Sequence, residues 1–167
     1  MNTVGQYRIL LVEDEDTKRN QIKSVLVEYF ENSIIEFAES QIDAQKRIEN
    51  ESWDLIILDI SLRISSLENA KITQLPNDSF AKNEIGGLNI TKRMQLLRIS
   101  KPTIVLTGLD YFRRSDAKKY EGERYDLEEL SKRLKDNLGD DLLAVIKYGM
   151  PNWKTMLNAE LRKNFIK

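Results

Sequence analysis

The chain has 167 residues, of which 26 are Lys or Arg and 27 are Asp or Glu, so its formal net charge is −1 at pH 7. This balance gives no overall positive field of the kind that binds nucleic acid. The sequence contains no Cys and no His, which excludes disulfides, thiol nucleophiles, imidazole acid–base chemistry and phosphohistidine. Any chemistry must therefore use carboxylates, amines, hydroxyls or backbone groups.

The chain carries no signal for a membrane or for secretion. No apolar run approaches the roughly 20 residues that a membrane-spanning helix needs. The first residues, MNTVGQYR, lack the apolar core of a signal peptide. Because the length also suits one domain with its own core, we expect a single cytoplasmic domain over residues 1–167 with no membrane partner.

Four short apolar runs predict strands that are buried on both faces. They cover residues 9–12, 55–58, 104–106 and 142–146. Most of their residues are Leu or β-branched, and they show no alternation with polar residues, which is typical of a parallel sheet. A weaker strand candidate, residues 34–37, lies between the first two.

Amphipathic stretches with the spacing of helices separate these runs. Their apolar stripes lie within residues 22–30, 44–48, 90–97, 127–138 and 153–165. Asp16 or Thr17 is expected to cap the first helix, and Ser40 the second. Asp126 and Glu129 have the spacing of a capping box ahead of the fourth helix.

Five strands and five helices in strict alternation predict a doubly wound α/β fold. Such a fold is a five-stranded parallel sheet between two layers of helices, a three-layer α/β/α arrangement. Two connections, about 63–85 and 111–125, are long for this fold and are predicted to be insertions. The basic run 113–119 in the second has no interleaved aromatic residues, so it is interpreted as a solvated face.

Polar residues follow the predicted strands at the edge where open α/β sheets bind ligands. They are Glu13, Asp14, Asp59, Thr107 and Lys147. Three clustered carboxylates repel one another and need a cation, and oxygen ligands without imidazole favour Mg²⁺. A carboxylate can also attack phosphorus, while a metal, an ammonium and a hydroxyl stabilise the phosphoryl oxygens. The pattern thus suits phosphoryl transfer.

Five segments resemble CheY-like receiver domains of response regulators, in the order of that family. They are ILLVEDE (9–15) for the first strand and acidic pair, DLIILDI (54–60) for the phosphoacceptor strand, GGL (86–88) for the start of the third helix, IVLTG (104–108) for the switch-threonine strand and VIK (145–147) for the lysine strand. Each motif is weak alone, but five in order are specific. The resemblance spans about residues 7–165 and implies the flavodoxin-like, CheY-like fold.

The resemblance implies a role for each of these polar residues. Asp59 would accept a phosphoryl group from a sensor histidine kinase or a phosphotransfer protein. The implied Mg²⁺ ligands are Glu13, Asp14, Asp59 and the backbone carbonyl of Ser61. Lys147 would pair with one phosphoryl oxygen, and Thr107 would turn inward to bond another. The chain would be a stand-alone receiver without an effector domain in two-component signal transduction, a phosphoprotein rather than an enzyme, with output through contact with a downstream protein.

The sequence departs from the family in three ways. Lys147 is followed by Tyr148, where the family usually has a proline with a cis bond. Because a non-proline cis bond costs about 3 kcal/mol, a trans bond is expected, and the reach of Lys147 becomes an open question. Ala144 replaces the aromatic switch residue of many members, and the two insertions lengthen the intervals from Asp59 to Thr107 and from Thr107 to Lys147.

Two other functions compete with the phosphorylated receiver. A pseudo-receiver would be an interaction module that no longer depends on phosphorylation, as the Lys147-Tyr148 junction and the insertions suggest. A phosphatase of the haloacid-dehalogenase type would also use Asp and Mg²⁺. Its first motif is nearly met at residues 14–16, but the fifth position is Lys18, and the acidic pair 140–141 precedes Lys147 rather than following it.

Both predicted insertions start beside the expected phosphoryl site. The first follows Asp59 and contains a few large apolar residues, so we expect it to fold over or beside the site and limit access to Asp59. The second follows Thr107 and would enlarge the face of the fourth helix, where we expect partner recognition.

Overall fold

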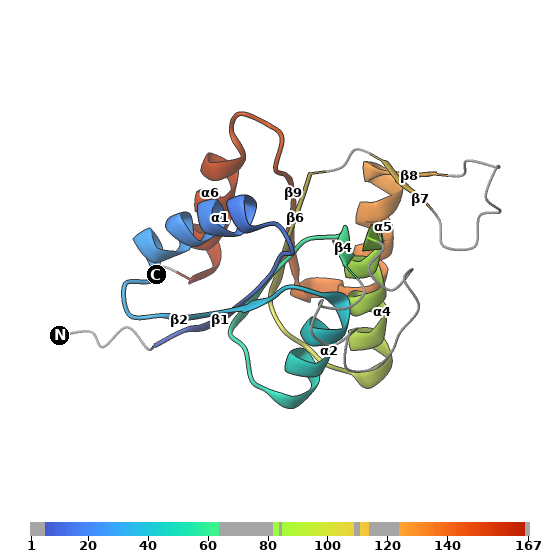
Figure 1. Ribbon diagram of the computed structural model, residues 1–167, viewed down its shortest axis with the longest axis horizontal. Helices are drawn as coiled ribbons and strands as arrows, with labels where there is room; N and C mark the ends of the chain where they lie inside the picture. The colour runs from blue at the N-terminus through green and yellow to red at the C-terminus, as the bar shows by residue number, and fades with distance from the viewer. Residues whose placement is uncertain (1–5, 64–81, 84, 109–110, 114–123, 166–167) are drawn as a thin grey trace.

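A five-stranded parallel sheet forms the centre of the fold (Figure 1). Its strands, in spatial order, are β2 (Ile34–Ala38), β1 (Arg8–Val12), β3 (Leu55–Leu58), β6 (Thr103–Thr107) and β9 (Leu142–Lys147). All four pairings are parallel. The computed structural model describes residues 6–63, 82–83, 85–108, 111–113 and 124–165. Within them, the prediction of a five-stranded parallel sheet is confirmed.

Helices cover both faces of the sheet, as a doubly wound fold requires (Figure 1). One face is covered by α1 (Asp16–Tyr29) and α6 (Trp153–Phe165), and the other by α2 (Gln41–Asn50), α4 (Gly86–Leu97) and α5 (Leu127–Leu138). A short 3-10 helix, η2 (Gly139–Asp141), joins α5 to β9. Among the described residues, no helix combines the length and apolar character needed to cross a bilayer.

Successive strand residues point to opposite faces of the sheet and so pack into two separate hydrophobic cores. In β1, Leu10 and Val12 pack on the side of α2, α4 and α5, whereas Ile9 and Leu11 pack on the side of α1 and α6. All four residues are fully buried. The interiors of β1, β3, β6 and β9 are apolar, so the polar residues of these four strands lie at their ends, and the candidate site lies at the carboxyl ends.

Two of the helix caps predicted from the sequence are present in the structure, and a third is not. Ser40 accepts a hydrogen bond from the backbone of Asp43 at 3.2 Å, and Asp126 accepts one from Glu129 at 2.7 Å, as predicted. The prediction that Asp16 or Thr17 caps α1 is wrong, because the N-cap is Glu15 and its side chain makes no capping bond. The amide of Glu15 instead donates to Glu13 Oε1 at 2.9 Å.

The two ends of each predicted insertion pair with each other as a short antiparallel ribbon. β4 (Leu62–Arg63) pairs with β5 (Lys82–Asn83), and β7 (Tyr111–Arg113) pairs with β8 (Arg124–Asp126). Sequence analysis did not predict these ribbons. Residues 64–81 and 114–123 lie outside the described part of the chain. The lid expected of the first insertion and most of the recognition surface expected of the second therefore stay predictions.

The start of α4 packs against the loop that follows β3. The amide of Gly87 donates to the Ile60 carbonyl at 2.8 Å. A Cβ on Gly87 would lie 2.3 Å from the carbonyl oxygen of Asp59 and 2.7 Å from the Ile60 Cα, both backbone atoms. Only a residue without a side chain allows this approach, so Gly87 fixes the position of the Asp59 loop.

We therefore predict that Gly87→Ala destabilises the chain by at least about 2 kcal/mol, because backbone atoms must shift to admit the methyl group. Gly149→Ala is the matched control, since a Cβ there meets nothing within 4 Å, and it should change stability by no more than about 0.5 kcal/mol. Urea unfolding followed by circular dichroism measures both. Equal stability of the two variants would contradict the proposed constraint.

Candidate functional site

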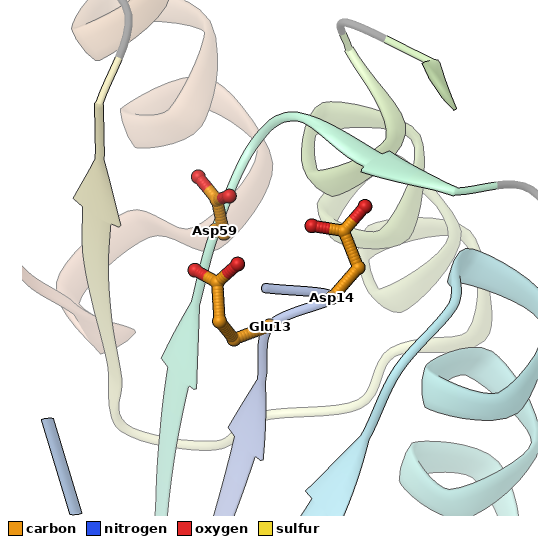
Figure 2. A group of neighbouring side chains, drawn as sticks. All are labelled: Glu13, Asp14 and Asp59. Carbon is orange, nitrogen blue, oxygen red and sulfur yellow. The ribbon is translucent and has the colours of Figure 1, made fainter. Parts of the chain in front are cut away.

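Three carboxylates meet at the carboxyl end of the sheet (Figure 2). Glu13 and Asp14 directly follow β1, and Asp59 directly follows β3, the neighbouring strand. Each offers an oxygen, and these oxygens lie within 4.8 Å of one another. Glu13 is 1% exposed and Asp59 5%. The structure brings together the three acidic residues that the sequence singled out, while their role as metal ligands stays a prediction.

The backbone holds Asp59 in place. Its amide donates to the carbonyl of Val12 at 3.0 Å, which ties the end of β3 to the end of β1. Its Oδ1 accepts a hydrogen bond from the amide of Ile60 at 2.7 Å. Asp14 is held similarly, because its Oδ2 accepts from the amide of Arg63 at 3.1 Å. Ile60, in the connection after β3, and Arg63, in β4, thus orient the carboxylates that follow both strands.

A lysine that sequence analysis did not assign to the site lies between two of these carboxylates. Lys18 Nζ is 2.8 Å from Glu13 Oε2 and 3.2 Å from Asp59 Oδ2, and the Lys18 side chain is only 5% exposed. A signal for it was present in the sequence. Lys18 shares the helical face of Ile22 and Val25, which point into the core, so it is a charged residue on an apolar stripe.

The side chain of Tyr148 forms a wall beside this lysine. The Lys18 ammonium lies 5.2 Å from the centre of the Tyr148 ring, within the range of a cation–π interaction. The Tyr148 hydroxyl donates to Gln21 Oε1 at 2.7 Å, and its ring packs against Trp153 with centroids 5.0 Å apart. The described residues include no cis peptide bond, so the Lys147–Tyr148 bond is trans, as the missing proline predicts.

The remaining predicted site residues lie around the same edge of the sheet. Thr107 ends β6 and is fully buried, and Lys147 ends β9 as its register partner and is half-buried. Ser61 is buried two residues after Asp59. Ala144 pairs with Ile104 and packs against the core formed with α1 and α6. The roles proposed for these residues in a phosphoryl site stay predictions.

Burial and mutual repulsion dominate the electrostatics of the site. Burial, followed by repulsion from Asp59, raises the pKa of Glu13 to about 7, although Lys18 opposes the shift. Burial alone would lower the pKa of Lys18, but Asp59 and Glu13 together outweigh it and raise that pKa. Lys18 is therefore a permanent cation at neutral pH. Glu13, in contrast, exchanges its proton near neutral pH.

The donor set fits a small, hard cation. All three candidate ligands offer carboxylate oxygen, and together they carry more negative charge than Lys18 neutralises. Oxygens around Mg²⁺ at its usual bond length of about 2.1 Å lie at most about 4.2 Å apart. The candidate oxygens lie within 4.8 Å of one another, a span close to that which the ion requires. Glu13, Asp14 and Asp59 would hold it.

Comparison with known proteins supports the fold. No protein-family model matches the chain, and no curated protein matches its sequence. Among solved structures, the CheY-like response regulator receiver domain protein from Methanospirillum hungatei JF-1 has a TM-score of 0.59 and 20% identity, covering 96% of this chain and 94% of that one. The signal receiver domain of an HD domain-containing protein from Pseudomonas fluorescens Pf-5 has a TM-score of 0.58 and 17% identity, over 95% and 94%.

A third similar structure contains a metal. It is the receiver domain of a sensor histidine kinase from Pseudomonas aeruginosa PAO1, with a magnesium ion coordinated in its active-site cleft. Its TM-score is 0.58 at 16% identity, covering 97% of this chain and 98% of that one. The chain therefore has the CheY-like receiver fold over nearly all its length.

The raised pKa of Glu13 predicts how stability depends on pH when divalent metals are chelated. Its pKa is about 7 in the folded chain against an ordinary 4.5, so the folded chain holds the extra proton between these values. Stability should fall as pH rises through this window. Glu13→Gln should reduce the fall by on the order of 1–2 kcal/mol.

Urea unfolding at pH 5 and pH 8 in the presence of a chelator tests this prediction. The Gln side chain retains an oxygen to accept the Glu15 amide. The control is Glu31→Gln, an exposed position in the described part of the chain, which should behave as wild type. A pH dependence of Glu13→Gln equal to that of wild type would show that Glu13 does not titrate in this window.

Proposed function

We propose that the chain is a response-regulator receiver that accepts a phosphoryl group on Asp59 in two-component signal transduction. The observation that carries the proposal is the position of Asp59 directly after β3, with carboxylate oxygens of Glu13 and Asp14 within 4.8 Å, in a receiver fold. A carboxylate so placed can act as a nucleophile. The donor would be a sensor histidine kinase or a phosphotransfer protein.

The proposed reaction is an in-line phosphoryl transfer. A carboxylate oxygen of Asp59 forms a bond to phosphorus as the bond from phosphorus to the donor's histidine nitrogen breaks, and the electron pair stays on that nitrogen. Glu13, Asp14, Asp59 and the carbonyl of Ser61 would hold Mg²⁺, which supplies positive charge to the phosphoryl oxygens. Lys147 would add a further positive charge.

The surroundings of Asp59 hold its carboxylate in one orientation. Oδ1 accepts the Ile60 amide at 2.7 Å, while Oδ2 faces Lys18 at 3.2 Å. The hydrogen bond from the Ile60 amide restricts rotation of the Asp59 carboxylate. The orientation of the carboxylate therefore does not have to be established during the reaction. Receipt of a phosphoryl group, rather than repeated turnover of a substrate, is the activity that we propose.

Output is proposed to depend on Thr107 and on the surface near α5. Thr107 lies fully buried at the end of β6, and the β7–β8 ribbon, which begins four residues later at Tyr111, leads into α5. Its hydroxyl would bond a phosphoryl oxygen, and the resulting movement would be read by a downstream protein. Because Ala144 stands where many receiver domains have an aromatic switch residue, Thr107 would move without that aromatic partner.

A second candidate, the pseudo-receiver, is favoured by a specific observation. Lys18 already supplies a cation to Glu13 and Asp59, at 2.8 and 3.2 Å. A module that uses this ion pair only to stabilise its fold would interact with partners in the same way whether or not a phosphodonor is present. Labelling of Asp59 therefore separates the two candidates.

We predict that incubation with acetyl phosphate and Mg²⁺ adds one phosphoryl group to the wild-type chain, detected by intact-protein mass spectrometry. Asp59→Asn should remove the labelling entirely, and Asp14→Ala should reduce it at least tenfold through loss of a metal ligand. Exposed Asp54, which follows no strand, provides the matched control Asp54→Asn. Labelling that persists in Asp59→Asn would place the acceptor elsewhere, and no labelling at all would favour the pseudo-receiver.

We further predict that Thr107→Ala retains labelling but loses the conformational response, because Asp59 is the nucleophile whereas Thr107 senses the product. Thr107→Ser keeps the hydroxyl and should keep the response. Tryptophan fluorescence on addition of beryllofluoride is a suitable measurement, since Trp153 contacts Tyr148 beside the site. A full response in Thr107→Ala would mean that another residue carries the switch.

A further inference from the structure

Lys18 is the residue of the site that neither the sequence motifs nor the proposed mechanism uses. Its ammonium contacts Glu13 and Asp59, which are two of the three candidate metal ligands. Lysine side chains are almost never buried unless they are paired. Its 5% exposure therefore reflects a specific pairing with the carboxylates and not an accidental position.

The geometry of α1 directs Lys18 toward the carboxylates. The helix begins at Asp16, only three residues after Glu13, so Lys18 lies in its first turn. Helical side chains tilt toward the N-terminus of their helix. A long side chain in this turn therefore extends back over the ends of β1 and β3. Its position on the apolar stripe with Ile22 keeps its stem buried and out of solvent.

Tyr148 and Gln21 support this arrangement from the other side. Gln21 lies one helical turn beyond Lys18 and accepts the Tyr148 hydroxyl at 2.7 Å, which places the Tyr148 ring 5.2 Å from the ammonium. The amide of Tyr148 donates to the Thr107 carbonyl at 2.8 Å, so β6 also anchors this residue. The ammonium thus has carboxylates on one side and an aromatic ring on another.

We propose that Lys18 is a resident counter-ion that competes with Mg²⁺ for Glu13 and Asp59 and so weakens metal binding by this site. The inference rests on the metal site of the proposed function but not on phosphoryl transfer. Two cations cannot both approach the same carboxylate oxygens without mutual repulsion. Mg²⁺ must therefore displace the ammonium from at least one carboxylate, or bind beside it against that repulsion.

The test compares Mg²⁺ binding by the full-length wild-type chain, Lys18→Met and Lys23→Met in isothermal titration calorimetry. Lys23→Met makes the same change of charge on the same helix, but at an exposed position. Lys18→Met should bind Mg²⁺ at least about tenfold more tightly than wild type, because its carboxylates have lost their cation. Lys23→Met should lie within about twofold of wild type, since exposed charges are screened by salt.

The results separate failure of this inference from failure of the metal site. Equal or weaker Mg²⁺ binding by Lys18→Met overturns the inference alone, because Lys18 would then not compete with the ion. Absence of Mg²⁺ binding in wild type and Lys18→Met alike overturns the inference together with the metal site. Equally tighter binding in Lys18→Met and Lys23→Met also overturns it, because the effect would come from net charge.

A second pair of variants protects the test against loss of folding. Removing one partner of a buried ion pair is strongly destabilising, because it leaves the other charge buried without compensation. The double variant Glu13→Gln with Lys18→Met removes one charge of each sign and so keeps the charge balance of the site. This double variant is compared with Glu13→Gln alone, so that the carboxylates stay the same and only the lysine differs. The rise in Tm with Mg²⁺ concentration also reports affinity for a destabilised chain. The double variant should show the larger rise, and an equal or smaller rise overturns the proposal.

Discussion

Repulsion among three carboxylates at one end of the sheet is the constraint on which the site depends. Parallel strands place their carboxyl ends side by side, so Glu13, Asp14 and Asp59 meet as soon as β1 and β3 pair in register. Buried like charges oppose folding unless cations or hydrogen bonds offset them. Backbone amides of Ile60 and Arg63, together with the ammonium of Lys18, supply this compensation. The same groups also orient the carboxylates, so the interactions that permit folding are those that prepare the site.

The sequence predicted the features that depend on local pattern. Continuous apolar runs placed β1, β3, β6 and β9, and the residue after each run lies at the expected edge of the sheet. It could not predict features that depend on long-range contacts. The ribbon of β4 with β5 joins residues separated by the whole first insertion, and no local pattern gives their register. The predicted N-cap of α1 was wrong for a different and local reason, since the Glu15 amide is satisfied by the side chain of Glu13 two residues earlier, a residue that the sequence assigned to metal binding.

Lys18 shows why a resemblance to a family identifies some site residues and not others. A family motif marks the positions at which members share a residue type, and Lys18 lies outside the five segments of this chain that resemble such motifs. Its importance follows from physical properties: a charged residue on an apolar helical stripe must find a partner within the fold, and the first turn of α1 lies next to the acidic strand ends. Helical periodicity therefore contained the information, but only in combination with the strand order.

Lys18 and Tyr148 are physically one feature. Taken separately, Tyr148 leaves the backbone beside Lys147 without the constraint that a proline would impose, and Lys18 adds a charge to an apolar face. In the structure, the Tyr148 ring lies against the Lys18 ammonium, and its hydroxyl bonds to Gln21 on the same helix. A proline has neither a ring with a negative face nor a hydroxyl donor, so it could provide neither contact. The position after Lys147 thus links β9 to α1 and to the cation in the acidic cluster, which relates the unusual junction to the charge balance of the site.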